Sequence, residues 1–225
     1  MFWGGNLTHE DCAVNRLLRI GLFAGLLALS PAMASAQQIA AAPDQQTAAK
    51  QVVEKFQDQL LGVMKNADSL GLDGRRAKLT PAVNQTFDLK YMAQTSVGAA
   101  WETMTPAQRD ELVELFRRMT VSTYAARFKG YSGQTWKVEA VQATPQDAIY
   151  VRTVLTDPGK DKVAIDYLLR STDGTWKVAD VYLSRISELA VRRSEYSAVV
   201  RRDGVDKLLA TLEQKVKDVE AGRAS

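Results

Sequence analysis

The sequence predicts an α+β protein in which one antiparallel sheet is preceded by several helices and followed by two more. Apolar residues recur at three- and four-residue steps up to about residue 128. They alternate with polar residues from 136 to 182, as strands do, and return to helical spacing after 186. The links between the alternating segments are short, and short links join antiparallel neighbours, because a parallel crossover needs a dozen residues or more.

The segment before the sheet is predicted to be helical. Its apolar spacing predicts three helices, over residues 47–67, 75–85 and 89–97. A fourth, longer helix has the clearest start, because Thr105 is a preferred N-cap residue, Pro106 suits the first helical position and Gln108 can complete a capping box. The apolar stripe of this helix continues to about Phe128.

The alternating segment predicts four strands, over residues 136–140, 149–155, 163–169 and 176–182. Turn residues separate them, including Asp157-Pro158-Gly159 and Asp173-Gly174. Apolar side chains occur on both faces of the second strand, with Val151 on one face and Val154 on the other. This pattern fits either a sheet half-covered by helices or an apolar cavity between helices and sheet. The two closing helices are predicted over 186–200 and 205–219.

The N-terminus has the features of an export signal. Arg16 and Arg19 precede the apolar run 20–29, and the small residues Ala34-Ser35-Ala36 follow it. The run is shorter than the roughly 20 residues that span a bilayer, which favours cleavage after Ala36 over a membrane anchor. Ala32-Met33-Ala34 offers a second cleavage site. We expect a signal peptide over 1–36, a flexible leader over 37–46 and a single domain over 47–220.

Composition excludes several kinds of chemistry. The one histidine and the one cysteine, His9 and Cys12, both lie inside the predicted signal peptide. A chain without them cannot form a Ser-His-Asp triad, a cysteine nucleophile, a redox thiol or a histidine-based metal site. The net charge of +3, from 29 Lys and Arg against 26 Asp and Glu, is too weak to indicate nucleic acid binding. We expect no catalytic residue, no metal and no cofactor.

Short motifs occur in a fixed order between about residues 48 and 218: Phe87-Asp88-Leu89-Lys90-Tyr91-Met92, Trp101, Thr105-Pro106-Ala107-Gln108-Arg109, Tyr124-Ala125, Tyr131-Ser132-Gly133, Asp166-Tyr167-Leu168-Leu169, Asp173-Gly174-Thr175-Trp176, and Arg193-Ser194-Glu195-Tyr196. None is specific alone, but the ordered set resembles the MlaC family of periplasmic lipid-binding proteins. The resemblance implies a soluble, monomeric periplasmic shuttle that holds the acyl chains of a phospholipid in a cavity between helices and sheet. It also implies two partners: an outer-membrane lipoprotein complex, and an inner-membrane ABC transporter with an MCE-domain protein.

One stretch departs from the phospholipid branch of this family. In that branch the last strand leads into a Gly-x-Ser step and then Asn-Tyr-Arg, whereas here the stretch is Arg185-Ile186-Ser187-Glu188-Leu189-Ala190-Val191-Arg192-Arg193. This run resembles the HpnM branch, which is named for its association with hopanoid biosynthesis. The resemblance therefore implies a cargo that is either a phospholipid or a hopanoid.

Candidate lipid contacts are the inward-facing side chains of the long helix, the sheet and the helix that follows. Burial of apolar surface stabilises a complex by about 25 cal/mol per Å², so acyl chains need no polar anchor. The predicted lining is Phe116, Met119, Thr123, Tyr124, Val151, Ile165, Tyr167, Tyr182 and Leu189. For each of these residues the alternative is a position in the ordinary core.

Arg192 and Arg193 are candidate contacts for a headgroup phosphate or for an acidic partner surface, because guanidinium groups match phosphate oxygens. The alternative is a solvated helix face on which Glu188 and Glu195 lie three to four residues from Arg192.

Two other functions stay open beside the lipid shuttle. One is a non-transporting adaptor of a lipid biosynthesis complex, in which the cavity would be collapsed. The other is an enzyme that acts on a polycyclic lipid, which would need a carboxylate and a tyrosine converging inside the cavity. Asp166 or Asp180 near Tyr182 are the candidates, because unbroken alternation places Asp180 and Tyr182 on one face.

Overall fold

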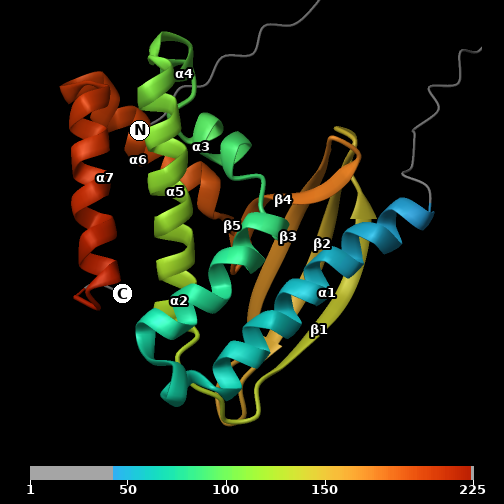
Figure 1. Cartoon of the computed structure of the whole chain (residues 1–225). Coiled ribbons are helices and arrows are strands. Elements are labelled where there is room, and N and C mark those ends of the chain that lie inside the picture. The colour runs from blue at the N-terminus through green and yellow to red at the C-terminus, as the bar shows by residue number, and fades with distance from the viewer. Residues whose placement is uncertain (1–42, 224–225) are drawn as a thin grey trace, which may run out of the picture. The chain divides into compact units, whose positions relative to one another are not determined.

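The computed structural model describes residues 43–223 (Figure 1). The predicted signal peptide and residues 37–42 of the predicted leader lie outside this range. The structure confirms the predicted α+β order of helices, antiparallel sheet and two closing helices. The first helix begins at Pro43, which lies inside the leader predicted over 37–46.

The helices before the sheet are α1 (Pro43–Lys65), α2 (Ala67–Thr86), α3 (Leu89–Val97), α4 (Ala100–Thr103) and α5 (Pro106–Arg127). Helix α5 begins with the predicted capping box. The Thr105 hydroxyl accepts a hydrogen bond from the Gln108 backbone N–H at 3.2 Å, and the Gln108 side chain accepts one from the Thr105 backbone N–H at 2.9 Å. Gly71 interrupts α2 with a φ of 59°, so the helix predicted from residue 75 is the part after this break.

The sheet consists of β1 (Thr135–Ala143), β2 (Ala148–Thr156), β3 (Val163–Thr172), β4 (Thr175–Leu183) and β5 (Ile186–Ser187), in the spatial order β1-β2-β3-β4-β5 and antiparallel throughout. The prediction of four strands was wrong by one, because β5 has two residues and is too short to show alternation. A two-residue turn joins β4 to β5. Its residues Ser184 and Arg185 have φ values of 49° and 69°, the left-handed conformation that tight hairpins require.

A bulge in β4 reverses the alternation expected from the sequence. Leu168 pairs with Asp180 but Leu169 pairs with Val178, so Ala179 is an extra residue on β4. Val178 before the bulge and Val181 after it therefore face the same side of the sheet. Two residues, Ala179 and Asp180, instead of one separate these two valines, and Asp180 faces the other side of the sheet.

Helix α1 crosses one face of the sheet and supplies much of the core (Figure 1). Val53, Phe56 and Leu60 of α1 are fully buried, as are Val151 and Tyr167 of the strands. The closing helices are α6 (Glu188–Asp203), which packs against α3, and α7 (Val205–Glu220), which packs along α5. The helices therefore form two groups, one on the sheet and one around α5.

A charged cluster fastens α7 to α5 and α2. Arg118 of α5 forms ion pairs with Glu213 at 2.8 Å and with Glu220 at 2.7 Å. Arg76 of α2 approaches the other oxygen of Glu220 at 3.0 Å. Hydrogen bonding from Arg118 holds the pKa of Glu220 below its ordinary value of 4.5, although burial opposes this shift.

We expect Glu220→Gln to lower the free energy of unfolding at pH 7 by about 1–3 kcal/mol, because two guanidinium groups lose their shared partner. A carboxylate whose folded pKa is depressed stabilises the fold above its unfolded pKa, and this contribution disappears as the pH falls through the folded value. Urea denaturation at pH 7 and below pH 4.5 should therefore show that acid lowers the free energy of unfolding less in the variant than in the wild type. Glu111→Gln, at an exposed position of α5, is the control. Equal stability of wild type and Glu220→Gln at pH 7 contradicts the prediction.

Candidate binding cavity

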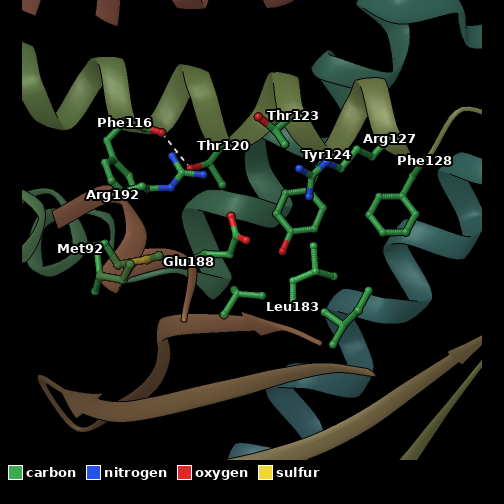
Figure 2. Close-up of a pocket in the computed structure, with 13 residues that line it drawn as sticks. Met92, Phe116, Thr120, Thr123, Tyr124, Arg127, Phe128, Leu183, Glu188 and Arg192 are labelled. Carbon is green, nitrogen blue, oxygen red and sulfur yellow. Dashed lines mark hydrogen bonds between the residues drawn. The ribbon is translucent and has the colours of Figure 1, made fainter. Parts of the chain in front are cut away.

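An apolar cavity of about 330 Å³ lies between α5, the strands β3 and β4, and the start of α6 (Figure 2). Its lining residues are Met92, Phe116, Thr120, Thr123, Tyr124, Arg127, Phe128, Ile165, Val181, Leu183, Glu188, Leu189 and Arg192. The volume falls at the lower end of the range of about 300–1,000 Å³ that is typical of small-molecule pockets.

Tyr124 is the central aromatic side chain of the cavity. Its ring packs edge-on against Phe56 with centroids 5.2 Å apart and stacks on Phe128 at 5.7 Å. Figure 2 shows its hydroxyl pointing away from α5 into the space above the strands. Burial raises the pKa of Tyr124 well above its ordinary value, so the hydroxyl stays protonated at neutral pH. The cavity thus has a neutral phenol hydroxyl in a mostly apolar wall.

Charged side chains mark the opening of the cavity. Four residues line both the cavity and a shallower groove between α5, α6 and α7: Arg127, Glu188, Arg192 and Thr123. They therefore lie where the interior of the cavity meets solvent. The guanidinium of Arg192 lies over the ring of Phe116, 5.2 Å from its centroid. An apolar interior with a charged opening can hold an amphiphilic molecule, with its tail inside and its polar group outside.

Asp180 fixes the start of α6 beside the cavity. Its Oδ1 accepts hydrogen bonds from the backbone N–H groups of Val181 at 2.7 Å and Leu189 at 3.1 Å, and its Oδ2 accepts one from the Ser187 hydroxyl at 2.6 Å. The Ser187 hydroxyl in turn accepts from the backbone N–H of Ala190 at 2.9 Å and caps the helix. Burial raises the pKa of the Asp180 carboxyl. Asp180 therefore does not line the cavity but positions Leu189, which does.

The structure brings together five of the nine predicted lining residues: Phe116, Thr123, Tyr124, Ile165 and Leu189. Met119 lines the adjacent groove instead. Val151 and Tyr167 are fully buried in the core and do not line the cavity. Tyr182 lies on the opposite face of the sheet, because of the bulge at Ala179, and packs edge-on against Tyr150. Contact of the five lining residues with a lipid stays a prediction.

The two predicted headgroup arginines have different surroundings. Arg192 stands at the cavity opening, whereas the guanidinium of Arg193 packs over Gly98 at the end of α3, 3.6 Å from the position of a Cβ there. Consecutive helical residues point about 100° apart, so only one of the pair faces the opening.

Sequence reasoning missed seven lining residues: Met92, Thr120, Arg127, Phe128, Val181, Leu183 and Glu188. Helical spacing could have found some of them, because Thr120 lies four residues after Phe116, and Arg127 and Phe128 lie three and four after Tyr124.

The candidate catalytic carboxylates do not enter the cavity. Asp180 and Tyr182 share a sheet face, as alternation predicts, but this face is not the one that lines the cavity. Asp166 accepts hydrogen bonds from the Tyr150 hydroxyl at 3.0 Å and from the Thr153 backbone N–H at 2.9 Å, which fills a gap in the β2–β3 ladder. These contacts give both aspartates a structural role.

Two properties of residues 43–223 bear on function. Over this range the structure has no cluster of three or more His, Cys, Asp or Glu side chains that could hold a metal ion. None of the helices described there is both long enough and apolar enough to cross a bilayer.

An α+β fold that encloses an apolar cavity with a charged opening is typical of a protein that binds a small apolar or amphiphilic ligand. The family model of the MlaC protein matches residues 54–214, and the chain belongs to the MlaC family. The fold is similar to that of the phospholipid-binding protein from Ralstonia solanacearum, whose structure was determined in complex with a phospholipid. The TM-score is 0.69 and the sequence identity 23%, over 76% of this chain and 98% of that one.

Proposed function

We propose that this protein is a periplasmic lipid carrier that holds the apolar part of one lipid molecule in the cavity beneath α5. The observation that carries the proposal is the cavity itself, whose wall is almost wholly apolar and whose opening is charged. Membership of the MlaC family supports it, and so does the phospholipid complex of the Ralstonia solanacearum protein.

The apolar wall can supply the affinity. Each buried methylene contributes about 0.8 kcal/mol, so ten methylenes of an acyl chain correspond to a dissociation constant of the order of micromolar before ordering costs. A lipid held in this way is screened from water without any covalent or metal-dependent step. This is what a carrier between two membranes requires.

The finer parts of the proposal come from the resemblance of the sequence. We propose that the carrier exchanges lipid with an outer-membrane lipoprotein complex and with an inner-membrane ABC transporter that has an MCE-domain protein. The run Ser187-Glu188-Leu189-Ala190 favours the HpnM branch, so the cargo is a phospholipid or a hopanoid. We also propose that the working unit is one chain.

Native mass spectrometry of the protein isolated from its own periplasm tests the proposal, followed by lipid extraction and fragmentation. We expect one lipid mass per chain, and the fragments will separate a phospholipid from a hopanoid. A ligand-free mass that does not change after incubation with lipid vesicles would contradict the carrier function and favour an adaptor. The open cavity already supports the carrier, since an adaptor has no use for it.

A further inference from the structure

We infer that the side of the sheet turned away from α1 is a docking surface for a protein partner, and that the surface of the partner that contacts it is acidic. This side, the outer face, includes Lys137, Tyr150, Arg152, Leu168, Arg170 and Tyr182. The inference goes beyond the proposed lipid-binding function, because the cavity lies on the other side of the sheet.

The outer face stays open to solvent within residues 43–223. Tyr150 of β2 pairs with Leu168 of β3, and Tyr182 of β4 lies on the same side of the sheet. All three keep part of their surface exposed, whereas Val151 and Tyr167, on the side that α1 crosses (Figure 1), are fully buried. The solvent side of an antiparallel sheet usually carries polar residues. Aromatic and aliphatic side chains on this side therefore indicate a surface that a partner covers.

Aromatic and arginine side chains of the outer face are already held in place. The rings of Tyr150 and Tyr182 pack edge-on with their centroids 5.2 Å apart. The guanidinium of Arg170 lies over the ring of Tyr91 of α3, 4.4 Å from its centroid, and 3.6 Å from a carboxylate oxygen of Asp88. Tyr and Arg are enriched at the energetically dominant positions of protein interfaces. Because these side chains are ordered before a partner binds, association costs less side-chain entropy.

The charged groups of the outer face that reach solvent are mostly positive. The side chains of Lys137 and Arg152 form no hydrogen bond or ion pair with any of residues 43–223. The ammonium of Lys177 donates to two backbone carbonyl oxygens at the end of α2, which leaves its charge uncompensated, and Arg170 adds a further positive charge. Glu139, at the bulge of β1, supplies one exposed negative charge. The excess is positive and is complementary to an acidic surface.

The other carboxylates at strand positions of this face are already engaged. Asp166 and Asp180 are both buried. Each accepts hydrogen bonds from neighbouring hydroxyl and backbone N–H groups. A partner that approaches the outer face therefore meets guanidinium, ammonium and phenol groups, which donate hydrogen bonds to carboxylates.

The kind of surface favours a protein over a lipid bilayer. Peripheral membrane binding combines basic residues with large apolar side chains that enter the bilayer. Among residues 43–223, the large apolar side chains that are most exposed are Tyr131, Ile186 and Val191, and none of them lies on the outer face. The pleated surface of the strands instead presents half-buried tyrosines flanked by basic groups, a composition typical of protein interfaces.

Photocrosslinking in living cells tests the inference with the full-length exported protein. A photoreactive benzophenone amino acid replaces Gln142, which is exposed on β1 and pairs with Tyr150 on the outer face. The same amino acid in place of Lys55, exposed on α1, is the control. We expect a protein adduct from position 142 that is absent from position 55, and mass spectrometry of the crosslinked peptides should place the crosslink in a segment rich in Asp and Glu.

The crosslinked partner, once purified, is titrated with the wild type and with Lys137→Glu/Arg152→Glu. We expect charge reversal to weaken binding by about tenfold or more, and added salt to weaken binding of the wild type. Lys55→Glu is the charge-matched control and should bind as the wild type does. Thermal unfolding checks that the variants fold. Lys137→Gln/Arg152→Gln, with a smaller loss expected, takes the place of the charge-reversed variant if that one unfolds.

Several results overturn the inference: no protein adduct from position 142, a crosslink in a segment that is not acidic, or equal affinity of wild type and charge-reversed variant. Vesicles that contain phosphatidylglycerol are the last arm. If the wild type binds them, the charge-reversed variant does not, and no protein adduct forms, the outer face is a membrane surface and the inference fails. Lipid retained per chain should be the same in the wild type and the charge-reversed variant. If the wild type retains no lipid but the crosslink forms as expected, the proposed function fails and the docking surface stands.

Discussion

Val181→Trp is expected to reduce the lipid retained per chain by at least about tenfold. Loss of contact between the protein and only two methylene groups of the lipid tail is enough to weaken binding by that factor. Val181 lies on β4 after the bulge and faces α5 across the cavity. An indole at this position fills space that the lipid tail needs. The cavity has only about 330 Å³, so it cannot accommodate both the indole and an acyl chain.

The neighbouring residue provides a matched control. Tyr182→Trp adds an indole to the same strand but on the opposite face, where the native ring packs against Tyr150. We expect this variant to retain lipid as the wild type does. Lipid retention is measured by native mass spectrometry after incubation with vesicles, and thermal unfolding confirms that both variants fold. If Tyr182→Trp blocks binding and Val181→Trp does not, the assigned face of β4 is wrong.

The comparison of these two residues also shows what the sequence can and cannot predict. Local signals predicted the helices and strands well: the capping box at Thr105 fixed the start of α5, and period-2 patterns located β1 to β4. The phase of β4 could not be predicted, because Ala179 fits an ordinary strand as well as a bulge. One inserted residue moved Tyr182 out of the candidate site and Val181 into it.

Tertiary contacts explain the other differences between the predicted site residues and the observed ones. Val151 and Tyr167 face the helices as predicted, but α1 covers them, so they belong to the core. Glu114 lies three residues before Arg117, whereas Arg127 has no acidic residue three or four positions before it, so the sequence already separates these two arginines. The partners of Arg118, which are Glu213 and Glu220 of α7, appear only when the helices are placed in space.

Asp180→Ala is expected to lower the free energy of unfolding by about 3 kcal/mol or more, because it leaves three donors without their acceptor. Two of these donors are the backbone N–H groups of Val181 and Leu189, and the third is the Ser187 hydroxyl. Chemical denaturation at pH 7 measures the loss. The same variant should retain less lipid, because Leu189 and the start of α6 are no longer held against β4.

Asp180→Asn separates the hydrogen bonds from the charge. Its single amide oxygen can still accept from Val181 and Leu189, so we expect a loss of only about 1 kcal/mol and nearly normal lipid retention. Burial raises the folded pKa of Asp180 above its ordinary value of 3.8, so ionisation of this group disfavours the folded state as the pH rises through that range. The asparagine variant has no ionisable group at this position. Its stability relative to the wild type should therefore improve from pH 3.8 towards neutral pH. If Asp180→Ala is as stable as Asp180→Asn, the carboxylate does not hold α6 at the cavity.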